Sequence, residues 1–214
     1  MADPLRVYLE TAKKWTFAAA LDWPGWARRD KGEEAALDAL LSYAERYAGV
    51  ADAVGGLEVG EPVVVGRVPG TQTTDFGAPD ARGPWDDEPY SAAELKRHAY
   101  LLAASWERFD AVVAGAPAVL PKGPRGGGRD RDQIVDHVRD AERAYGRKVG
   151  AKVPPRTPWP EQRALLLEAI RAGGGSAPTG STWPLRYAVR RLAWHVLDHA
   201  WEIEDKSVGR SELR

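Results

Sequence analysis

The strongest constraint on the fold is a change of pattern near residue 90. After that point, apolar residues recur every three to four positions in four stretches, at 91–115, 130–149, 160–172 and 183–206. This is the period of an amphipathic helix. Glycine, proline and threonine separate the stretches and favour turns there. Ser91 followed by Glu94 is a capping-box pattern, which predicts the start of the first helix. Four such helices without strands between them predict a bundle.

The residues before position 80 have a different pattern, of short strands around one helix. Residues 5–10 and 15–21 are β-branched or aromatic segments separated by four residues, which predicts a hairpin. A 3.6-residue period predicts a helix over 33–54, and 61–68 reads as a third strand. The expected order is therefore β-β-α-β. Residues 69–90 show no sustained period and are expected to form a connector.

Together these patterns predict a mainly helical protein in two parts. An α+β module is expected at residues 1–76, a linker at 77–90, and an all-α four-helix bundle at 91–214. The chain carries 30 Lys+Arg and 31 Asp+Glu, which argues against binding to nucleic acid by bulk charge but leaves a local basic patch open. No apolar run approaches the ~18 residues of a membrane span. The N-terminus lacks the pattern of a secretory signal, so the cytoplasm is the expected compartment.

The four histidines are the most informative polar residues, because the chain contains no cysteine that could act as a thiolate ligand or nucleophile. In the last helical stretch, His195 and His199 recur with leucine and isoleucine on one stripe, which should face the interior. Residues four apart lie one turn above the other, so both imidazoles can point at one atom. In the second stretch, His137 shares its stripe with Ile134 and Tyr145.

Three imidazoles on inward stripes need a common explanation, since a buried polar ring without a partner costs about 1–3 kcal/mol. A divalent metal bound by His137, His195 and His199 supplies one and leaves a coordination position for water or substrate. The alternative is that each histidine is hydrogen-bonded on its own within the core. His98 lies among Lys96, Arg97 and Tyr100 and is expected at a solvated or rim position.

Residues from about 85 to 206 resemble the DinB/YfiT-like superfamily of four-helix-bundle metalloenzymes. The resemblance rests on His137 in the second helix and on the H-x-x-x-H pair His195/His199 in the last. It implies a divalent metal, zinc or nickel, on these three residues, and a homodimer. Members include thiol-dependent S-transferases, so the resemblance also implies a small-molecule substrate and a thiol cofactor such as mycothiol or bacillithiol.

The N-terminal segment resembles the HicB-like antitoxin fold. The matching residues are 17–25, a strand followed by an Asp-Trp-Pro-Gly turn, and 32–37, a Gly-Glu-Glu-Ala-Ala-Leu helix start. An alternative is a structural module that packs on the bundle. A nucleic-acid role through this part is a third functional hypothesis, against which the balanced charge argues.

Carboxylates near the histidines are candidate second-sphere groups. Asp198 and Glu202 follow the two histidines of the last helix, and either could orient a ligating imidazole or act as a base. Alternatively, they are surface carboxylates paired with Arg191 or Lys206. Arg186, Arg190 and Arg191 are expected on a solvated helix face; the alternative is an anion contact, if one of them borders the metal cavity. The favoured function is a metal-dependent hydrolase or S-transferase, and the alternative is a non-catalytic binding or regulatory module.

Overall fold

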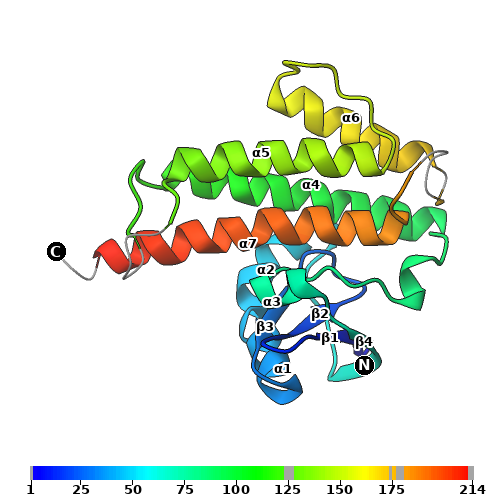
Figure 1. Ribbon diagram of the computed structural model, residues 1–214. Helices are drawn as coiled ribbons and strands as arrows, with labels where there is room; N and C mark the ends of the chain where they lie inside the picture. Colours follow the sequence, from blue (N-terminus) through cyan, green and yellow to red (C-terminus); the bar gives the residue numbers. More distant parts are fainter. Residues whose placement is uncertain (1, 123–127, 174, 177–180, 212–214) are drawn as a thin grey trace.

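The computed structural model describes residues 2–122, 128–173, 175–176 and 181–211. It shows a mixed α and β protein that is mainly helical (Figure 1). Four long helices lie above a small sheet; of the two N-terminal helices, the first packs against the sheet and the second contacts the long helices. Parts of two predicted interhelical segments, residues 123–127, 174 and 177–180, lie outside the described residues.

The sheet has four strands, β1 (Leu5–Thr11), β2 (Thr16–Ala20), β3 (Ala27–Asp30) and β4 (Pro62–Pro69). Their order is β3-β2-β1-β4, with antiparallel pairs β1–β2 and β2–β3 and a parallel pair β1–β4. The predicted hairpin is therefore confirmed. A parallel pair needs a crossover connection, and the helices α1 (Glu33–Ser42) and α2 (Ala44–Ala51) provide it.

The predicted β-β-α-β order was wrong. The prediction did not include β3, and it treated residues 33–54 as one continuous helix. The sequence of β3 is Ala-Arg-Arg-Asp, and only Ala27 of this edge strand is buried, so it carries no apolar alternation. The predicted helix over 33–54 is interrupted at Tyr43, whose ring packs against Trp201 at 4.9 Å, and it ends in the short helix η1 (Asp52–Val54). The strand was therefore missed for lack of a local signal, whereas the interruption of the helix accompanies a contact with a residue distant in the sequence.

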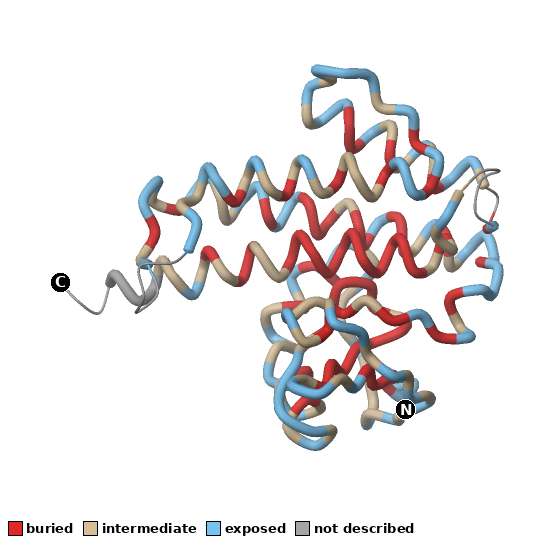
Figure 2. Tube along the Cα trace, viewed as in Figure 1, coloured by how far each residue is buried: buried red, intermediate tan, exposed pale blue. Residues whose placement is uncertain are grey.

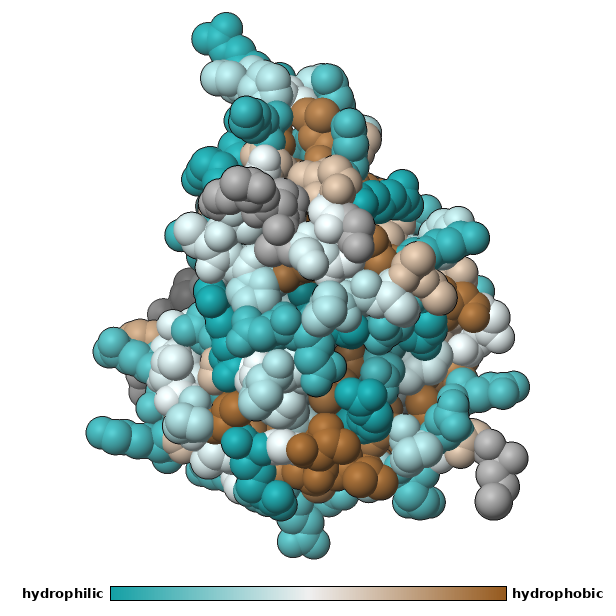
Figure 3. Space-filling model, turned by 90° about the vertical axis from the view of Figure 1, so that its right-hand side faces the viewer, coloured by the Kyte–Doolittle hydropathy of each residue, from teal (hydrophilic) through white to brown (hydrophobic). Residues whose placement is uncertain are grey.

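The connector over 69–90 contains two short helices, α3 (Gln72–Phe76) and η2 (Pro84–Asp86). Each is too short for a 3.6-residue period to be read from the sequence. At the free edge of the sheet, Val63 and Val65 of β4 are 46% and 44% exposed. The face of the molecule drawn in Figure 3 is largely hydrophilic, with apolar side chains gathered in a few places.

The long helices are α4 (Ala92–Gly115), α5 (Arg131–Lys148), α6 (Trp159–Ala172) and α7 (Leu185–Ser211). Their predicted bounds are confirmed to within two residues, except that α7 continues beyond 206. The capping box is also confirmed, since Ser91 Oγ accepts from the Glu94 amide at 3.3 Å. Helices α4 and α5 each contact both α6 and α7. No helix in the described part of the chain has the length and apolar character needed to cross a membrane.

The middle of α7 is buried on all sides, because it lies between the sheet and the other long helices (Figures 1 and 2). Trp194 packs edge-on against Phe17 of β2, with ring centroids 6.2 Å apart. The turn before β3 approaches α7 so closely that a Cβ on Gly25 would lie 3.0 Å from the Ala193 Cβ. Gly25 also has φ +95°, so this turn requires glycine on two grounds.

The arginines at the start of α7 are not on a solvated face, and that expectation was wrong. Arg190 donates to Asp86 at 2.7 Å and also to the hydroxyl of Tyr8 on β1. Arg186 donates to Glu94 at 2.9 Å. The linker and the sheet cover this end of the helix, and the buried guanidinium of Arg190 requires its carboxylate partner there.

The expected rim position of His98 was also wrong. The side chain is 4% exposed, and its Nδ1 atom forms a 3.0 Å hydrogen bond with the hydroxyl of Tyr90. Burial, with a further contribution from the charge of Arg97, lowers the pKa of His98 from 6.5 to about 3. The basic neighbours in the sequence did not indicate that the chain folds over this part of α4.

The substitution His98→Gln is expected to make the protein less sensitive to acid. Unfolding restores the ordinary pKa of His98, so the unfolded state binds more protons between about pH 6.5 and about 3. Stability therefore falls as the pH drops through this window, by up to about 1.4 kcal/mol per pH unit. Urea denaturation in the presence of chelator measures how much unfolding free energy each protein loses between pH 6.5 and about pH 5. This loss should be about 2 kcal/mol smaller in His98→Gln than in the wild type. Equal losses in the two proteins would contradict this assignment.

Candidate metal centre

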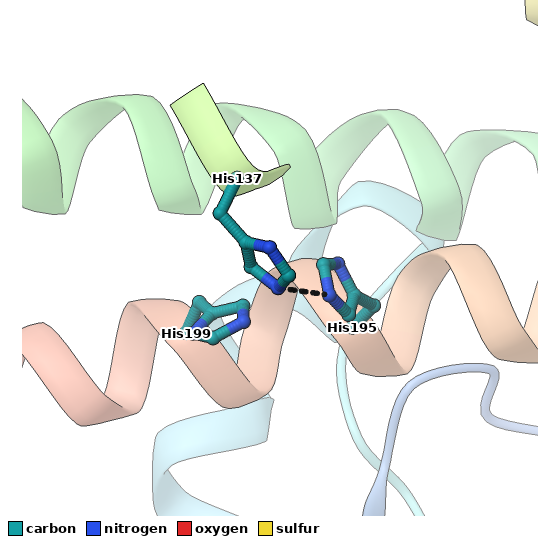
Figure 4. A group of neighbouring side chains, drawn as sticks. All are labelled: His137, His195 and His199. Atoms are coloured by element: carbon teal, nitrogen blue, oxygen red, sulfur yellow. Dashed lines mark hydrogen bonds between the residues drawn. The ribbon is translucent and has the colours of Figure 1, made fainter. Parts of the chain in front are cut away.

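Three of the four histidines lie together between α5 and α7 (Figure 4). His137 projects from α5 toward α7, and His195 and His199 lie one turn apart on α7. One nitrogen from each ring can be chosen so that all three lie within 4.8 Å of one another. The Nε2 atoms of His137 and His195 are 3.2 Å apart. The structure thus brings together the three residues that the sequence singled out.

The spacing of these nitrogens fits a shared divalent ion. Tetrahedral zinc with Zn–N bonds of about 2.0–2.1 Å places its ligand nitrogens about 3.3 Å apart. The 3.2 Å between His137 and His195 is close to that value. The His199 ring is packed at centroid distances of 5.0 Å from His137 and 4.8 Å from His195. The residues present therefore fit a three-histidine site for one ion.

The protonation of the cluster also suits metal binding. His195 is 8% exposed, and burial, with the neighbouring His199 and His137, lowers its pKa well below 6.5. Burial and His199 likewise lower the pKa of His137. Both imidazoles are therefore neutral at pH 7, which is the form that binds a metal.

Glu202 is the carboxylate that contacts the cluster. Its Oε2 atom lies 2.8 Å from the His199 Nδ1 atom, and its Oε1 atom accepts from Lys206 at 2.5 Å. Burial opposes ionisation of Glu202, but the hydrogen bonds from His199 and Lys206 outweigh it and lower its pKa to about 2. Since Nδ1 of His199 is engaged, Nε2 is the nitrogen left for a metal. A carboxylate behind a ligating imidazole commonly fixes its orientation.

Asp198 lies on another side of α7 and does not contact the three histidines. Its Oδ1 atom accepts from Arg28 of β3 at 3.0 Å. The Arg28 guanidinium also lies over the ring of Tyr43, 4.0 Å from its centroid. The structure therefore separates the two candidate carboxylates: Glu202 lies beside His199, and Asp198 connects α7 to the sheet. Neither pairs with Arg191.

Access to the cluster is partial. His137 and His199 are partly exposed, and His195 is buried. Five of the best-formed cavities between described residues are lined by other side chains and not by His137, His195 or His199. Three of them, of about 440, 450 and 630 Å³, have the size of a ligand-binding cleft, and they lie at the start of α7, beside His98, and next to Thr11 and Thr71. Solvent therefore reaches the histidines at the surface between α5 and α7.

Two further residues border the cluster: Tyr145, expected on the stripe of His137, and Arg191, one of the three arginines expected on a solvated face or at the rim of the metal cavity. The Tyr145 ring stands edge-on to His195, with centroids 5.6 Å apart. Arg191 lies one turn before His195 on α7, and its guanidinium is 5.7 Å from the Tyr145 ring centroid. The i, i+4 spacing of Arg191 and His195 was a signal that could have identified this neighbour.

Comparisons of the chain with protein-family models, with curated proteins and with solved structures found no match. The DinB-like and HicB-like resemblances therefore remain predictions from sequence motifs. The candidate site is defined by the convergence of His137, His195 and His199 and by the carboxylate of Glu202 behind them.

Proposed function

We propose that the protein is a metal-dependent enzyme of the DinB-like four-helix-bundle class. One divalent ion, zinc or nickel, would be held by His137, His195 and His199. The observation that carries the proposal is the convergence of three imidazoles from two helices, with the two Nε2 atoms of His137 and His195 3.2 Å apart. Three protein ligands leave a coordination position for water or substrate, as in catalytic rather than structural zinc sites.

The proposed reaction is attack of an activated water or thiolate on a small electrophilic substrate. A bound divalent ion lowers the pKa of water and stabilises a thiolate. Since the chain has no cysteine, a thiol nucleophile would come from a low-molecular-weight cofactor such as mycothiol or bacillithiol. Hydrolase and S-transferase activities both follow from this chemistry.

The protein's own groups divide the remaining work. Glu202 is ionised at neutral pH and accepts the Nδ1 proton of His199, so it holds that imidazole in the tautomer whose Nε2 is a ligand. It is thus a positioning residue, and it is the stronger of the two carboxylate candidates. Asp198 is the weaker candidate for a base because its carboxylate is held by Arg28.

The proposal includes the setting of the enzyme. We propose a cytoplasmic homodimer that acts on a small molecule and binds neither membranes nor nucleic acid. The 30 basic and 31 acidic residues support the last point. The HicB-like module would then serve as a structural support for α7, which it contacts through Phe17 and Arg28.

A second candidate function is a non-catalytic binding or regulatory module, with the helices as a scaffold or metal sensor. One observation favours it: the five cavities described above are not lined by His137, His195 or His199. An enzyme is expected to turn over electrophiles with mycothiol or bacillithiol, or to hydrolyse them, only when metal-loaded. A sensor is expected to bind the ion and show no turnover.

Metal analysis of protein prepared without an affinity tag tests the proposal. We expect about one equivalent of zinc or nickel per chain, and the absence of stoichiometric metal would overturn it. Glu202→Gln should weaken metal affinity by about 10–100-fold, because the amide no longer accepts the His199 proton as strongly. Asp198→Asn is the matched control on the same helix, and its affinity should stay within about threefold of wild type. Equal weakening in both variants would argue against the role of Glu202.

A further inference from the structure

Arg191 is a buried arginine whose charge has no carboxylate partner among the described residues. The side chain is 9% exposed. Its one hydrogen bond to a described residue runs from Nη1 to the carbonyl oxygen of Pro79, at 2.5 Å. The two other buried arginines differ. Arg190 pairs with Asp86, and Arg163 pairs with carboxylates of its own. A guanidinium has five N–H donors, so most of those on Arg191 have no protein acceptor among the described residues and remain open to a ligand or water.

The position of this guanidinium is beside the histidine cluster. Arg191 and His195 lie one turn apart on α7. The Tyr145 ring centroid is 5.7 Å from the guanidinium carbon of Arg191 and 5.6 Å from the His195 ring centroid. The Trp194 ring centroid is 4.9 Å from the guanidinium carbon. The charge of Arg191 contributes to the lowered pKa of His195. A cavity of about 10 Å³ on its sheet side has room for about one water and cannot admit a ligand.

The charges around the cluster leave an excess of positive charge. The carboxylate of Glu202 is balanced by Lys206, and Asp140, near His137, has Arg139 beside it. Arg129, exposed just before α5, and the buried Arg191 add positive charge near His137 and His195. Leaving a charge buried without a counter-ion is costly. A negatively charged ligand at the cluster would therefore be stabilised.

We infer that the substrate of this centre carries an oxyanion group, a carboxylate or a phosphate, which Arg191 binds. This inference rests on the proposed metal site. The planar guanidinium can donate two parallel hydrogen bonds to either group, a geometry that a lysine cannot reproduce. The aromatic rings of Tyr145 and Trp194 beside the guanidinium restrict its movement and exclude water from one face. Arg191 thereby determines specificity for charge, while the histidines hold the ion.

Cobalt-loaded, tag-free protein provides the test, because the visible absorption of Co²⁺ reports both its ligands and nearby anions. Acetate and inorganic phosphate are titrated separately at constant ionic strength, so that the two sources of the oxyanion are distinguished. We expect a saturable spectral change with at least one of them. Arg191→Gln should weaken that binding by about tenfold or more. Arg139→Gln is the control, since Arg139 is two residues from His137 but exposed and paired with Asp136.

Each outcome separates this inference from the proposed function. If the protein takes up no cobalt, the metal site itself fails. If cobalt binds but neither anion changes the spectrum, or if Arg191→Gln binds the anion as tightly as wild type, the metal site stands and the inference is overturned. Circular dichroism checks the folding of the variant. If Arg191→Gln does not fold, Arg191→Lys replaces it, because lysine keeps the charge without the paired donors. We expect this variant to bind the anion more weakly than wild type but measurably. Unchanged binding would overturn the inference.

Discussion

Replacing Glu142 by alanine is expected to lower the free energy of unfolding by about 3 kcal/mol or more. Glu142 is 1% exposed on α5 and accepts hydrogen bonds from Arg163 at 3.1 Å and from the Trp159 indole at 2.5 Å. Its removal leaves a buried guanidinium and an indole N–H without this acceptor. Breaking a buried ion pair from one side typically costs about 3–5 kcal/mol. The bond between Arg163 and the half-exposed Asp110 remains and keeps the loss near the lower end.

Asp136→Ala on the same helix is the matched control. Asp136 pairs with Arg139 at 2.8 Å, but both side chains are largely exposed, at 63% and 43%. Exposed pairs contribute less than about 1 kcal/mol. Urea denaturation with a shared m-value would measure both changes. A loss below about 1 kcal/mol for Glu142→Ala would show that the network of Glu142, Arg163, Trp159 and Asp110 does not stabilise the fold.

This network also bears on the candidate site, because it fixes the helix that carries His137. Arg163 and Trp159 belong to α6, Asp110 belongs to α4, and Glu142 lies five residues after His137 on α5. The network therefore joins three helices by directional bonds. Hydrophobic packing alone would allow α5 to rotate or slide by small amounts, and such movement would change the 3.2 Å spacing between His137 and His195.

The long helices could be predicted because their signals are local. The Ser91–Glu94 box defines the start of α4, and glycine and proline separate the four apolar periods. The histidine cluster was predictable for the same reason. The spacing of His195 and His199 places them on one face of α7, and the apolar neighbours of His137 place it on the inward face of α5. Two inward faces of packed helices then meet.

The rest of the site depends on contacts between distant residues. Nothing near Asp198 in the sequence shows that it pairs with Arg28, 170 positions away. Likewise, Arg190 and Asp86 are 104 positions apart. The apolar stripe of α7 also led to the wrong prediction of a solvated face opposite to it. A helix that lies between a sheet and other helices has no solvated face along its middle. Arg190 and Arg191 were therefore expected near solvent although they are buried.

His195→Ala is expected to abolish stoichiometric metal binding. The proposed site has three protein ligands, and His195 is the buried one, with its Nε2 atom 3.2 Å from the Nε2 atom of His137. Two imidazoles on separate helices hold an ion far less tightly than three, so metal analysis of the tag-free variant should fall from about one equivalent to near zero. His98→Gln is the control, since His98 is bonded to Tyr90 and is outside the cluster. It should retain the full metal content.

The same substitution should remove the stabilisation that the ion gives to the fold. A ligand present at 100 times its Kd stabilises the folded state by about 2.7 kcal/mol. For a chain of this length, 1 kcal/mol shifts the Tm by about 2–4 °C, so chelation should lower the wild-type Tm by about 5–11 °C. His195→Ala should show no such change, because it has no ion to lose. If chelation lowers the Tm of both proteins equally, the ion binds elsewhere. If it lowers neither although metal is bound, the three histidines hold the ion without coupling α5 to α7.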